Sequence, residues 1–226
     1  MDTLKSKSRF SVRKAHKTQL QLSKKITLED RLPEKIRFVA GVDVAYVKGT
    51  SIGAVAVLDY DSLELAESQV ACCKTRFPYI PTLLSFRELP PTLMSIRKLK
   101  MQPDLFLVDG QGFAHPYRCG FASHLGLVIG KPTVGVAKSR LIGKAEESNK
   151  ENVSFLKYKG EIVGAVVITK YGHKPVYVSV GHMTSLETAI KIVKHCTLSG
   201  WIPEPILKAH EIAALAKRKI NNALTT

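Results

Sequence analysis

The hydrophobic and polar positions early in the chain form three β-prone segments, and short turns separate these segments. The segments are RFVAGVDVAYV (37–47), SIGAVAVLDY (51–60) and LELAESQVAC (63–72), with Gly49 and Asp61 in the turns. β-prone runs joined in this way predict an antiparallel meander.

The middle of the chain favours alternating strands and helices. Continuous apolar runs at 103–110 and 131–137 predict buried parallel strands, and residues 118–130 between them predict a helix. A meander followed by β-α-β units predicts an α/β protein of three layers, in which helices flank a central mixed β-sheet. The remaining expected elements are strands over 152–182 with turns at Lys159-Gly160 and Tyr171-Gly172, and two closing helices at 185–197 and 205–221.

Two segments fit this pattern less simply. Residues 18–28 (TQLQLSKKITL) predict a helix that packs on the edge of the domain, within a basic N-terminal segment at 1–30. Residues 82–100 hold helical material that we expect Pro90 and Pro91 to interrupt, because proline lacks the N–H that a helix interior needs. The expected organisation is the N-terminal segment followed by a single domain at 31–226.

Residues 76–81 read RFPYIP, so two prolines bracket a tyrosine and an isoleucine. Proline fixes its own φ and pushes the preceding residue towards extended geometry. The segment is therefore neither helix interior nor central strand. It predicts a stiff prong that carries an aromatic ring.

The net charge of the chain narrows the class of partner that we expect. The 226 residues include 34 Lys and Arg against 19 Asp and Glu, a formal net charge of +15. A surplus of this size favours a polyanionic partner, with nucleic acid ahead of an anionic membrane surface. The alternative is a general adaptation of surface charge without a specific partner.

The chain lacks the signals of membrane and secreted proteins. No apolar run reaches the roughly 18 residues of a membrane span, and the basic N-terminus has no apolar stretch of a secretory signal. The four cysteines have no CxxC spacing, so neither a zinc site nor a disulfide framework is indicated. We expect reduced, mostly buried thiols in a cytoplasmic protein.

Asp43 lies in the middle of an apolar strand, where an ionised carboxylate is costly unless something pairs with it. Gly41 and Ala45 share its face of the strand. Their small size predicts space above the carboxylate. The alternative is a partly exposed Asp on an edge strand.

Asp109 ends the apolar run LFLVDG, and Gly110 allows the backbone to turn sharply there. Ligands of α/β sheets gather at the carboxyl ends of strands, although Asp-Gly also occurs as a simple turn. If the two strands are neighbours, Asp43 and Asp109 repel each other unless a cation lies between them. One or two carboxylates suit magnesium or manganese, which can activate water against a phosphodiester.

Three more side chains are candidates for chemistry. Glu88 is a candidate third carboxylate, against the alternative of a helix-surface Glu beside Arg87. Lys138 follows an apolar strand, where an ammonium can orient a nucleophile or meet a phosphate. His210 lies on an expected helix and can reach a metal or its water, although a lone helical His is more often structural or solvated. The glycine-rich segment 109–121 leaves backbone groups accessible to a flat polar ligand.

These residues, in this order, resemble the endonuclease V family of deoxyinosine-specific repair nucleases. The resemblance implies a ribonuclease H-like fold and a magnesium-dependent endonuclease, with manganese as the expected substitute. It implies cleavage of the second phosphodiester bond 3′ to a hypoxanthine, which leaves 3′-hydroxyl and 5′-phosphate ends. Seven motifs carry it together, between about residues 36 and 220: VAGVDVAY, FPYIPTLLSFRE, DLFLVDGQGFAHP, GFASHLGL, PTVGVAKSRL, VSVGH and IPEPILKAH.

The resemblance also implies a role for each candidate side chain. Asp43 and Asp109 become metal ligands, and Glu88 completes the acidic cluster. Lys138 orients the attacking water, and His210 lies close to the metal.

The resemblance gives the prong and the glycine-rich segment roles in base recognition. Turning a base out of the stack costs a few kcal/mol, and an aromatic wedge that fills the gap offsets part of this cost. Hypoxanthine presents an acceptor at O6 and a donor at N1–H, which backbone groups beside Gly110 and Gly120 can read. The implied wedge is Pro78, Tyr79, Ile80 and Pro81, and the implied base pocket is Leu84, Gly110, Gly120 and Phe121.

Two departures bear on these implications. Thr82 follows the wedge where some relatives have glycine, which affects the expected mobility of the wedge. The residues before Arg37 match poorly, which leaves them as a phosphate-binding arm or a disordered tail.

The expected partner is DNA containing deoxyinosine, bound by a monomer. Two alternatives stay open: a related nuclease that acts on inosine-containing RNA or on branched DNA, and a non-catalytic binder of deaminated nucleic acid. The acidic set of Asp43, Glu88 and Asp109 argues against the binder, which has no need of repelling carboxylates within a basic surface.

Overall fold

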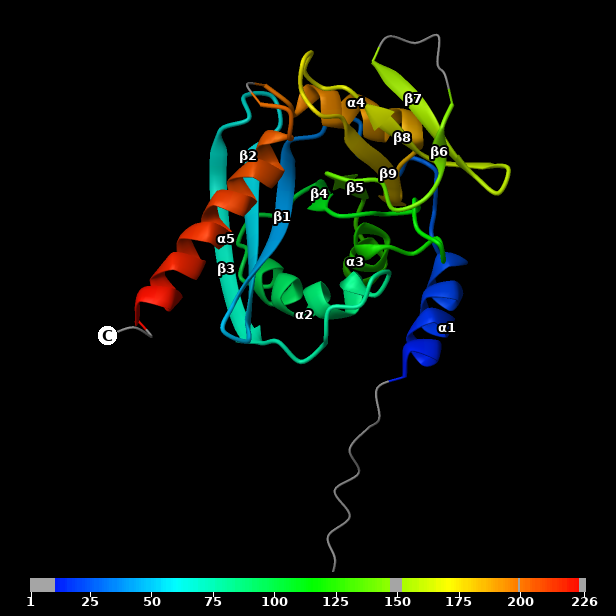
Figure 1. Ribbon diagram of the computed structural model, residues 1–226. Helices are drawn as coiled ribbons and strands as arrows, with labels where there is room; N and C mark the ends of the chain where they lie inside the picture. Colours follow the sequence, from blue (N-terminus) through cyan, green and yellow to red (C-terminus); the bar gives the residue numbers. More distant parts are fainter. Residues whose placement is uncertain (1–10, 147–151, 199, 224–226) are drawn as a thin grey trace, which may run out of the picture.

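A nine-stranded sheet runs through the molecule in the order β3-β2-β1-β4-β5-β9-β8-β7-β6 (Figure 1). The structure is a computed structural model, and it describes residues 11–146, 152–198 and 200–223. The strands are β1 (Phe38–Val47), β2 (Thr50–Asp59), β3 (Leu65–Lys74), β4 (Leu105–Asp109), β5 (Thr133–Ala137), β6 (Lys144–Ala145), β7 (Val153–Tyr158), β8 (Glu161–Val167) and β9 (Val176–His182).

Helices cover both faces of this sheet, so the fold has the three layers that the sequence predicted (Figure 1). α4 and α5 pack on one face, α2 and α3 pack on the other, and α1 contacts α3. The helices are α1 (Val12–Ser23), α2 (Leu84–Ile96), α3 (Phe121–Ile129), α4 (Leu186–His195) and α5 (Glu204–Ala223).

The sheet is mixed, and its pairing confirms the main sequence predictions. β1, β2 and β3 form the antiparallel meander, whose first turn has positive φ at Lys48 and Gly49. β4 pairs in parallel with both β1 and β5. Four of the five residues of β4 and all five of β5 are buried, because helices cover both faces, and this explains their continuous apolar runs.

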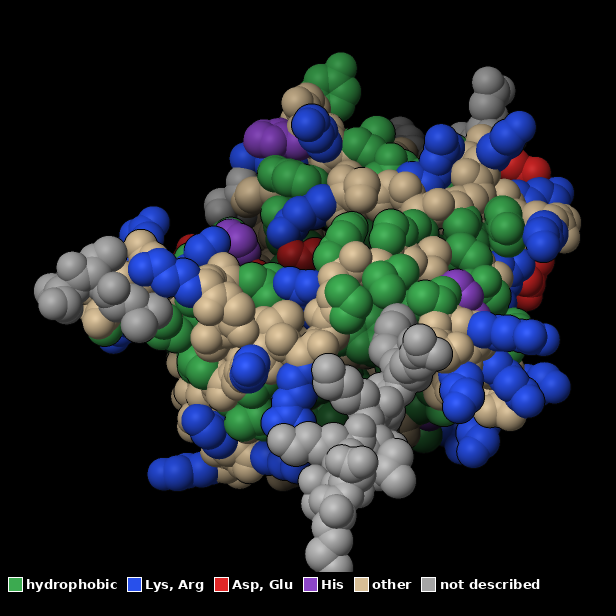
Figure 2. All heavy atoms as spheres, turned by 60° about the horizontal axis from the view of Figure 1, so that its bottom comes forward, with side chains coloured by type: hydrophobic (Ala, Val, Ile, Leu, Met, Phe, Trp, Pro, Cys, Tyr) green, Lys and Arg blue, Asp and Glu red, His purple; other side chains and the backbone are tan. Residues whose placement is uncertain are grey.

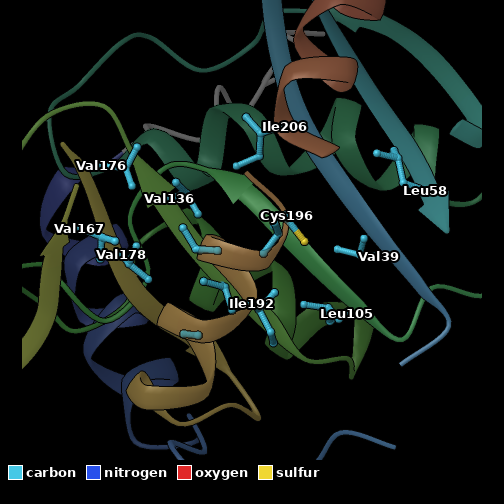
Figure 3. Packing of buried hydrophobic residues seen from close by; sticks show 14 of the residues in the cluster. Val39, Leu58, Leu105, Val136, Val167, Val176, Val178, Ile192, Cys196 and Ile206 are labelled. Atoms are coloured by element: carbon cyan, nitrogen blue, oxygen red, sulfur yellow. The ribbon is translucent and has the colours of Figure 1, made fainter. Parts of the chain in front are cut away.

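Alternation along the central strands divides the core between the two faces. Val39 packs in the cluster under α4 and α5, whereas its neighbour Ala40 packs in the cluster under α2 and α3. Figure 3 shows part of the first cluster, to which β4 contributes Leu105, α4 contributes Ile192 and α5 contributes Ile206. Side chains from helices on both faces of the sheet can therefore reach the ends of β1 and β4.

Two predicted helices differ from the structure. α2 continues through Pro90 and Pro91, which we expected to interrupt it. Tertiary packing overrides the local preference here: Pro91 is buried against β2, where Gly53 lets the helix backbone approach closely. α1 begins six residues earlier than the predicted start at residue 18 and ends at Ser23, and its N-cap Ser11 accepts a hydrogen bond from the Lys14 N–H.

The cysteines are less buried than we expected. All four are free thiols; Cys119 and Cys196 are buried, Cys73 is half-buried and Cys72 is exposed on the edge strand β3. In the described part of the chain, no helix combines the length and the apolar character that crossing a membrane requires.

Candidate active site

Asp43 and Asp109 occupy equivalent positions on adjacent parallel strands. The last paired residues of β1 and β4 are Val42 and Val108, so the two aspartates come next on each strand. Alternation places both side chains on the face that α5 covers. β1 is a central strand between β2 and β4, which excludes the edge-strand interpretation of Asp43.

α5 fills the space that we predicted above Asp43. A Cβ added to Gly41 would lie 1.8 Å from the carbonyl oxygen of Pro205, so the small residue admits the helix backbone rather than a ligand. Five residues further along α5, the Nδ1 atom of His210 lies 2.7 Å from Oδ2 of Asp43. The close approach at Gly41 thus brings His210 to the carboxylate.

Asp109 has its own cationic partner. The Nζ atom of Lys138, which follows β5, donates to Oδ2 of Asp109 at 2.5 Å. Burial raises the pKa of Asp109, Lys138 opposes this increase, and Asp43 adds to it by repulsion. The parallel pairing of β4 with β5 therefore places an ammonium beside the carboxylate.

Glu88 reaches the same region from α2, on the opposite face of the sheet. Its side chain is 8% exposed, which excludes the helix-surface interpretation. Burial raises the pKa of Glu88 to about 8, and repulsion from Asp43 and Asp109 acts in the same direction. The hydroxyl of Tyr46 donates to its Oε1 at 3.3 Å. The three carboxylates therefore interact electrostatically, as a shared site requires.

The carboxylate oxygens of Asp43, Asp109 and Glu88 are ligands that suit a hard divalent cation. Within the described residues, no three His, Cys, Asp or Glu side chains already form a metal cage, and Asp43 and Asp109 each contact a nitrogen, that of His210 and of Lys138 respectively. Magnesium does not need such a cage, because it binds through one or two carboxylates and keeps several waters. Burial and then repulsion from Asp43 and Asp109 raise the pKa of Glu88, and a cation bound between these carboxylates would offset the repulsion.

Sequence reasoning missed two residues that support the cluster. Tyr46 shares β1 with Asp43 but faces the other side, where it meets Glu88. The guanidinium of Arg87 lies 4.2 Å from the centre of the Tyr46 ring. Period-2 alternation along β1 indicated that Tyr46 faces away from Asp43, but both contacts depend on where α2 crosses the sheet.

One cavity of about 300 Å³ connects the acidic region with the prong. Its volume is at the lower end of the range for small-molecule sites. Its lining includes Asp109 and Lys138, three of the four wedge positions (Tyr79, Ile80 and Pro81), and all four positions of the implied base pocket (Leu84, Gly110, Gly120 and Phe121). Residues from five separate segments of the chain thus meet around one space.

The backbone of this cavity is partly engaged within the protein. The N–H of Gly110 donates to the Val136 carbonyl, and the N–H of Gly120 donates to the Gly112 carbonyl. These two donors are therefore not free to read a base. Phe121 is 2% exposed and belongs to the core, so it forms a fixed wall.

The prong carries its aromatic ring at the surface. Residues 76–81 have no regular secondary structure, and the side chain of Tyr79 is 71% exposed. Figure 2 shows a face of the molecule on which Lys and Arg side chains surround a central hydrophobic area, with few acidic side chains. An exposed aromatic ring on a basic protein suits a nucleic-acid partner.

A mixed sheet that brings carboxylates to the ends of adjacent strands, in a protein this basic, fits a metal-dependent nuclease. Residues 20–211 match the sequence model of the Endonuclease V family. The chain is 47% identical over 215 residues to Endonuclease V of Rippkaea orientalis, covering 93% of each chain. The chain belongs to the Endonuclease V family and is an endonuclease.

Solved structures support the same assignment. Endonuclease V from Streptomyces avermitilis superposes with a TM-score of 0.87 at 34% identity, covering 93% of this chain and 95% of that one. Endonuclease V from Ciona intestinalis, in complex with a 24mer DNA containing an inosine followed by a ribo-adenosine, gives 0.83 at 33% identity, covering 92% and 98%. The three-layer mixed sheet is therefore the fold of this family.

Proposed function

We propose that the protein is a metal-dependent DNA repair endonuclease that recognises deoxyinosine. It cuts the second phosphodiester bond 3′ to the lesion and leaves 3′-hydroxyl and 5′-phosphate ends. One observation carries the proposal: the cavity that holds Asp109 and Lys138 is also lined by Tyr79 of the prong and by the implied base pocket. The residues proposed to recognise the base and those proposed to act in cleavage thus line the same cavity.

The acidic side chains hold the cation in this proposal. Asp43 and Asp109 are its ligands, and Glu88 completes the negative site from the opposite face. When bound, magnesium or manganese supplies positive charge that stabilises the scissile phosphate and favours ionised water. Lys138 orients the attacking water from beside Asp109, and His210 positions Asp43 through its 2.7 Å contact.

The wedge and the pocket select the lesion. Pro78 to Pro81 enter the duplex, and Tyr79 occupies the gap that the turned-out base leaves. Leu84 and Phe121 provide apolar walls for hypoxanthine. Because the N–H groups of Gly110 and Gly120 are engaged, its O6 and N1–H are read by the neighbouring backbone groups.

A cleavage assay tests the proposed function. Matched duplexes carry one deoxyinosine, one inosine or neither, and each is incubated with magnesium or with a chelator. We expect one magnesium-dependent nick, at the second bond 3′ to deoxyinosine, and an intact undamaged duplex. Preferential cutting beside inosine in RNA would instead identify an RNA-directed enzyme, and binding without any nick would identify a non-catalytic binder.

Replacing Tyr79 by alanine tests the wedge. We expect binding to the deoxyinosine duplex to weaken by about tenfold or more, because one stacked aromatic contributes about 1–3 kcal/mol. Binding to the undamaged duplex should change little, since no base is turned out there. Titrations of both duplexes measure the two affinities, and equal losses on both would refute the wedge role.

Several finer expectations remain predictions of this proposal. They are the preference for magnesium over manganese, a monomeric enzyme, a cytoplasmic location, and the division of the chain into a segment at 1–30 and a nuclease domain at 31–226.

A further inference from the structure

Both ends of the wedge are fastened to the body of the protein. At the first end, Nη1 of Arg87 donates to the Phe77 carbonyl at 3.2 Å. The Phe77 ring also stacks on Phe86, with ring centres 5.7 Å apart. α2 thus fixes the start of the wedge through Phe86 and Arg87, which directly precede Glu88 on the same helix.

Thr82 forms the second end, and its backbone is strained. Its φ is 72°, in the left-handed region where glycine is the usual residue. A non-glycine residue persists there only when its surroundings hold it. The Thr82 carbonyl accepts hydrogen bonds from Nε2 of Gln19 at 2.7 Å and from Nε2 of His115 at 2.9 Å.

Gln19 lies on α1, within the residues before Arg37 for which we predicted a phosphate-binding arm or a disordered tail. Its side chain is fully buried. The same Nε2 atom also donates to the Cys119 carbonyl at 3.1 Å, directly before Gly120 of the base cavity. One amide group therefore joins α1, the end of the wedge and the edge of the pocket.

Two aromatic residues extend this network. The His16 ring of α1 stacks on Tyr117 at 4.2 Å between centres, and its Nε2 lies 3.1 Å from the Thr82 hydroxyl. The Tyr117 N–H donates to Nδ1 of His115 at 3.2 Å, which leaves Nε2 as the atom that carries the proton and donates to Thr82. Burial lowers the pKa of His115 to about 4, so the ring keeps this neutral form at neutral pH.

We propose that α1 braces the wedge, and that Gln19 is a positioning residue for strand separation. A wedge must resist being pushed back when it enters a duplex, yet Tyr79 at its tip is largely exposed and cannot supply that resistance itself. The resistance comes from the two fastened ends, and α1 supplies much of the second. This inference rests on the proposed wedge function.

The test compares two substrates that differ only in whether the strands must be separated. One is a duplex with a single deoxyinosine; the other carries the same deoxyinosine within a bubble of unpaired bases. Gln19→Met keeps the side-chain length and removes both hydrogen bonds. We expect its single-turnover rate on the duplex to fall by roughly tenfold or more, as for a misplaced catalytic or binding group. Its rate on the bubble should stay within about twofold of the wild-type rate, because the strands there are already apart and the position of the wedge matters less.

Gln21→Met is the matched control. Gln21 lies on α1 two residues away with an exposed side chain, so the same chemical change should leave both rates unaltered. His16→Ala is a second variant that leaves Gln19 in place: it removes the contact with the Thr82 hydroxyl, and at Tyr117 it removes the ring stack and the 3.1 Å contact between His16 Nδ1 and the hydroxyl. It should slow duplex cutting selectively, and it keeps the test decisive if Gln19→Met does not fold.

Three results would contradict the proposal that α1 braces the wedge. They are equal losses on duplex and bubble, unchanged duplex cutting by folded Gln19→Met and His16→Ala proteins, and a wild-type enzyme that cuts the duplex but not the bubble. A wild-type protein that cuts neither substrate would contradict the proposed function itself, so the two failures are distinguishable.

Discussion

Replacing Asp43 by asparagine is expected to abolish nicking at deoxyinosine while the protein stays folded. Asparagine keeps the shape of the side chain: its Oδ1 can still accept from the Val44 N–H, and its Nδ2 takes the place of the oxygen that faces His210, where it can donate to the ring Nδ1. It removes the negative charge that the proposed cation needs. Because a bound metal supplies several kcal/mol of transition-state stabilisation, the rate should fall by about 10³-fold or more.

The stability of the same variant should not fall. Asp43 repels Glu88 and Asp109, so removing its charge relieves part of the strain in the buried cluster. Single-turnover cleavage and thermal unfolding, measured on one preparation, separate the two effects. Asp61→Asn is the control, because Asp61 is a highly exposed acid whose partner Lys35 is also exposed. A variant of Asp43 that cuts at the wild-type rate would contradict its role.

Replacing Gly41 by alanine is expected to destabilise the whole domain. The new Cβ would lie 1.8 Å from the Pro205 carbonyl oxygen, which belongs to a helix backbone and cannot rotate away. Overpacking a core costs about 1–3 kcal/mol and occasionally more, and we expect the upper end here. For a domain of this size, the midpoint of thermal unfolding should fall by roughly 10 °C.

Cleavage should decrease in the Gly41 variant even below its melting temperature, because a displaced α5 carries His210 away from Asp43. Gly200→Ala is the matched control: its nearest neighbouring atom would be 3.8 Å from the new Cβ, an ordinary contact distance. Thermal scans of both variants decide the point. Equal melting temperatures would mean that α5 does not pack on β1 as described.

Much of the fold could be predicted because its signals are local. The β-prone runs of β1 and β2, the apolar runs of β4 and β5, and the Asp-Gly and Lys-Gly turns are each visible in a few adjacent residues. The convergence of Asp43 and Asp109 was conditional on their strands being neighbours, and the parallel pairing of β1 with β4 meets that condition. Their partners Lys138 and His210 were candidates by type and place in the chain.

The rest depends on contacts between distant segments. Gln19 meets a carbonyl 100 residues away, and nothing in the periodicity of α1 predicts this. Gly41 looked like room for a ligand because no local signal shows that α5 crosses there. α2 keeps its helical path through Pro90 and Pro91 because β2 packs against it, which is also a tertiary effect.

The central claim is that Asp43 and Asp109 share a divalent cation. Anomalous scattering from crystals soaked in manganese tests it most directly, because the signal identifies the ion without any assay of activity. We predict a peak about 2 Å from a carboxylate oxygen of each aspartate. Crystals in which both aspartates keep their contacts with His210 and Lys138, with no anomalous peak between them, would contradict it.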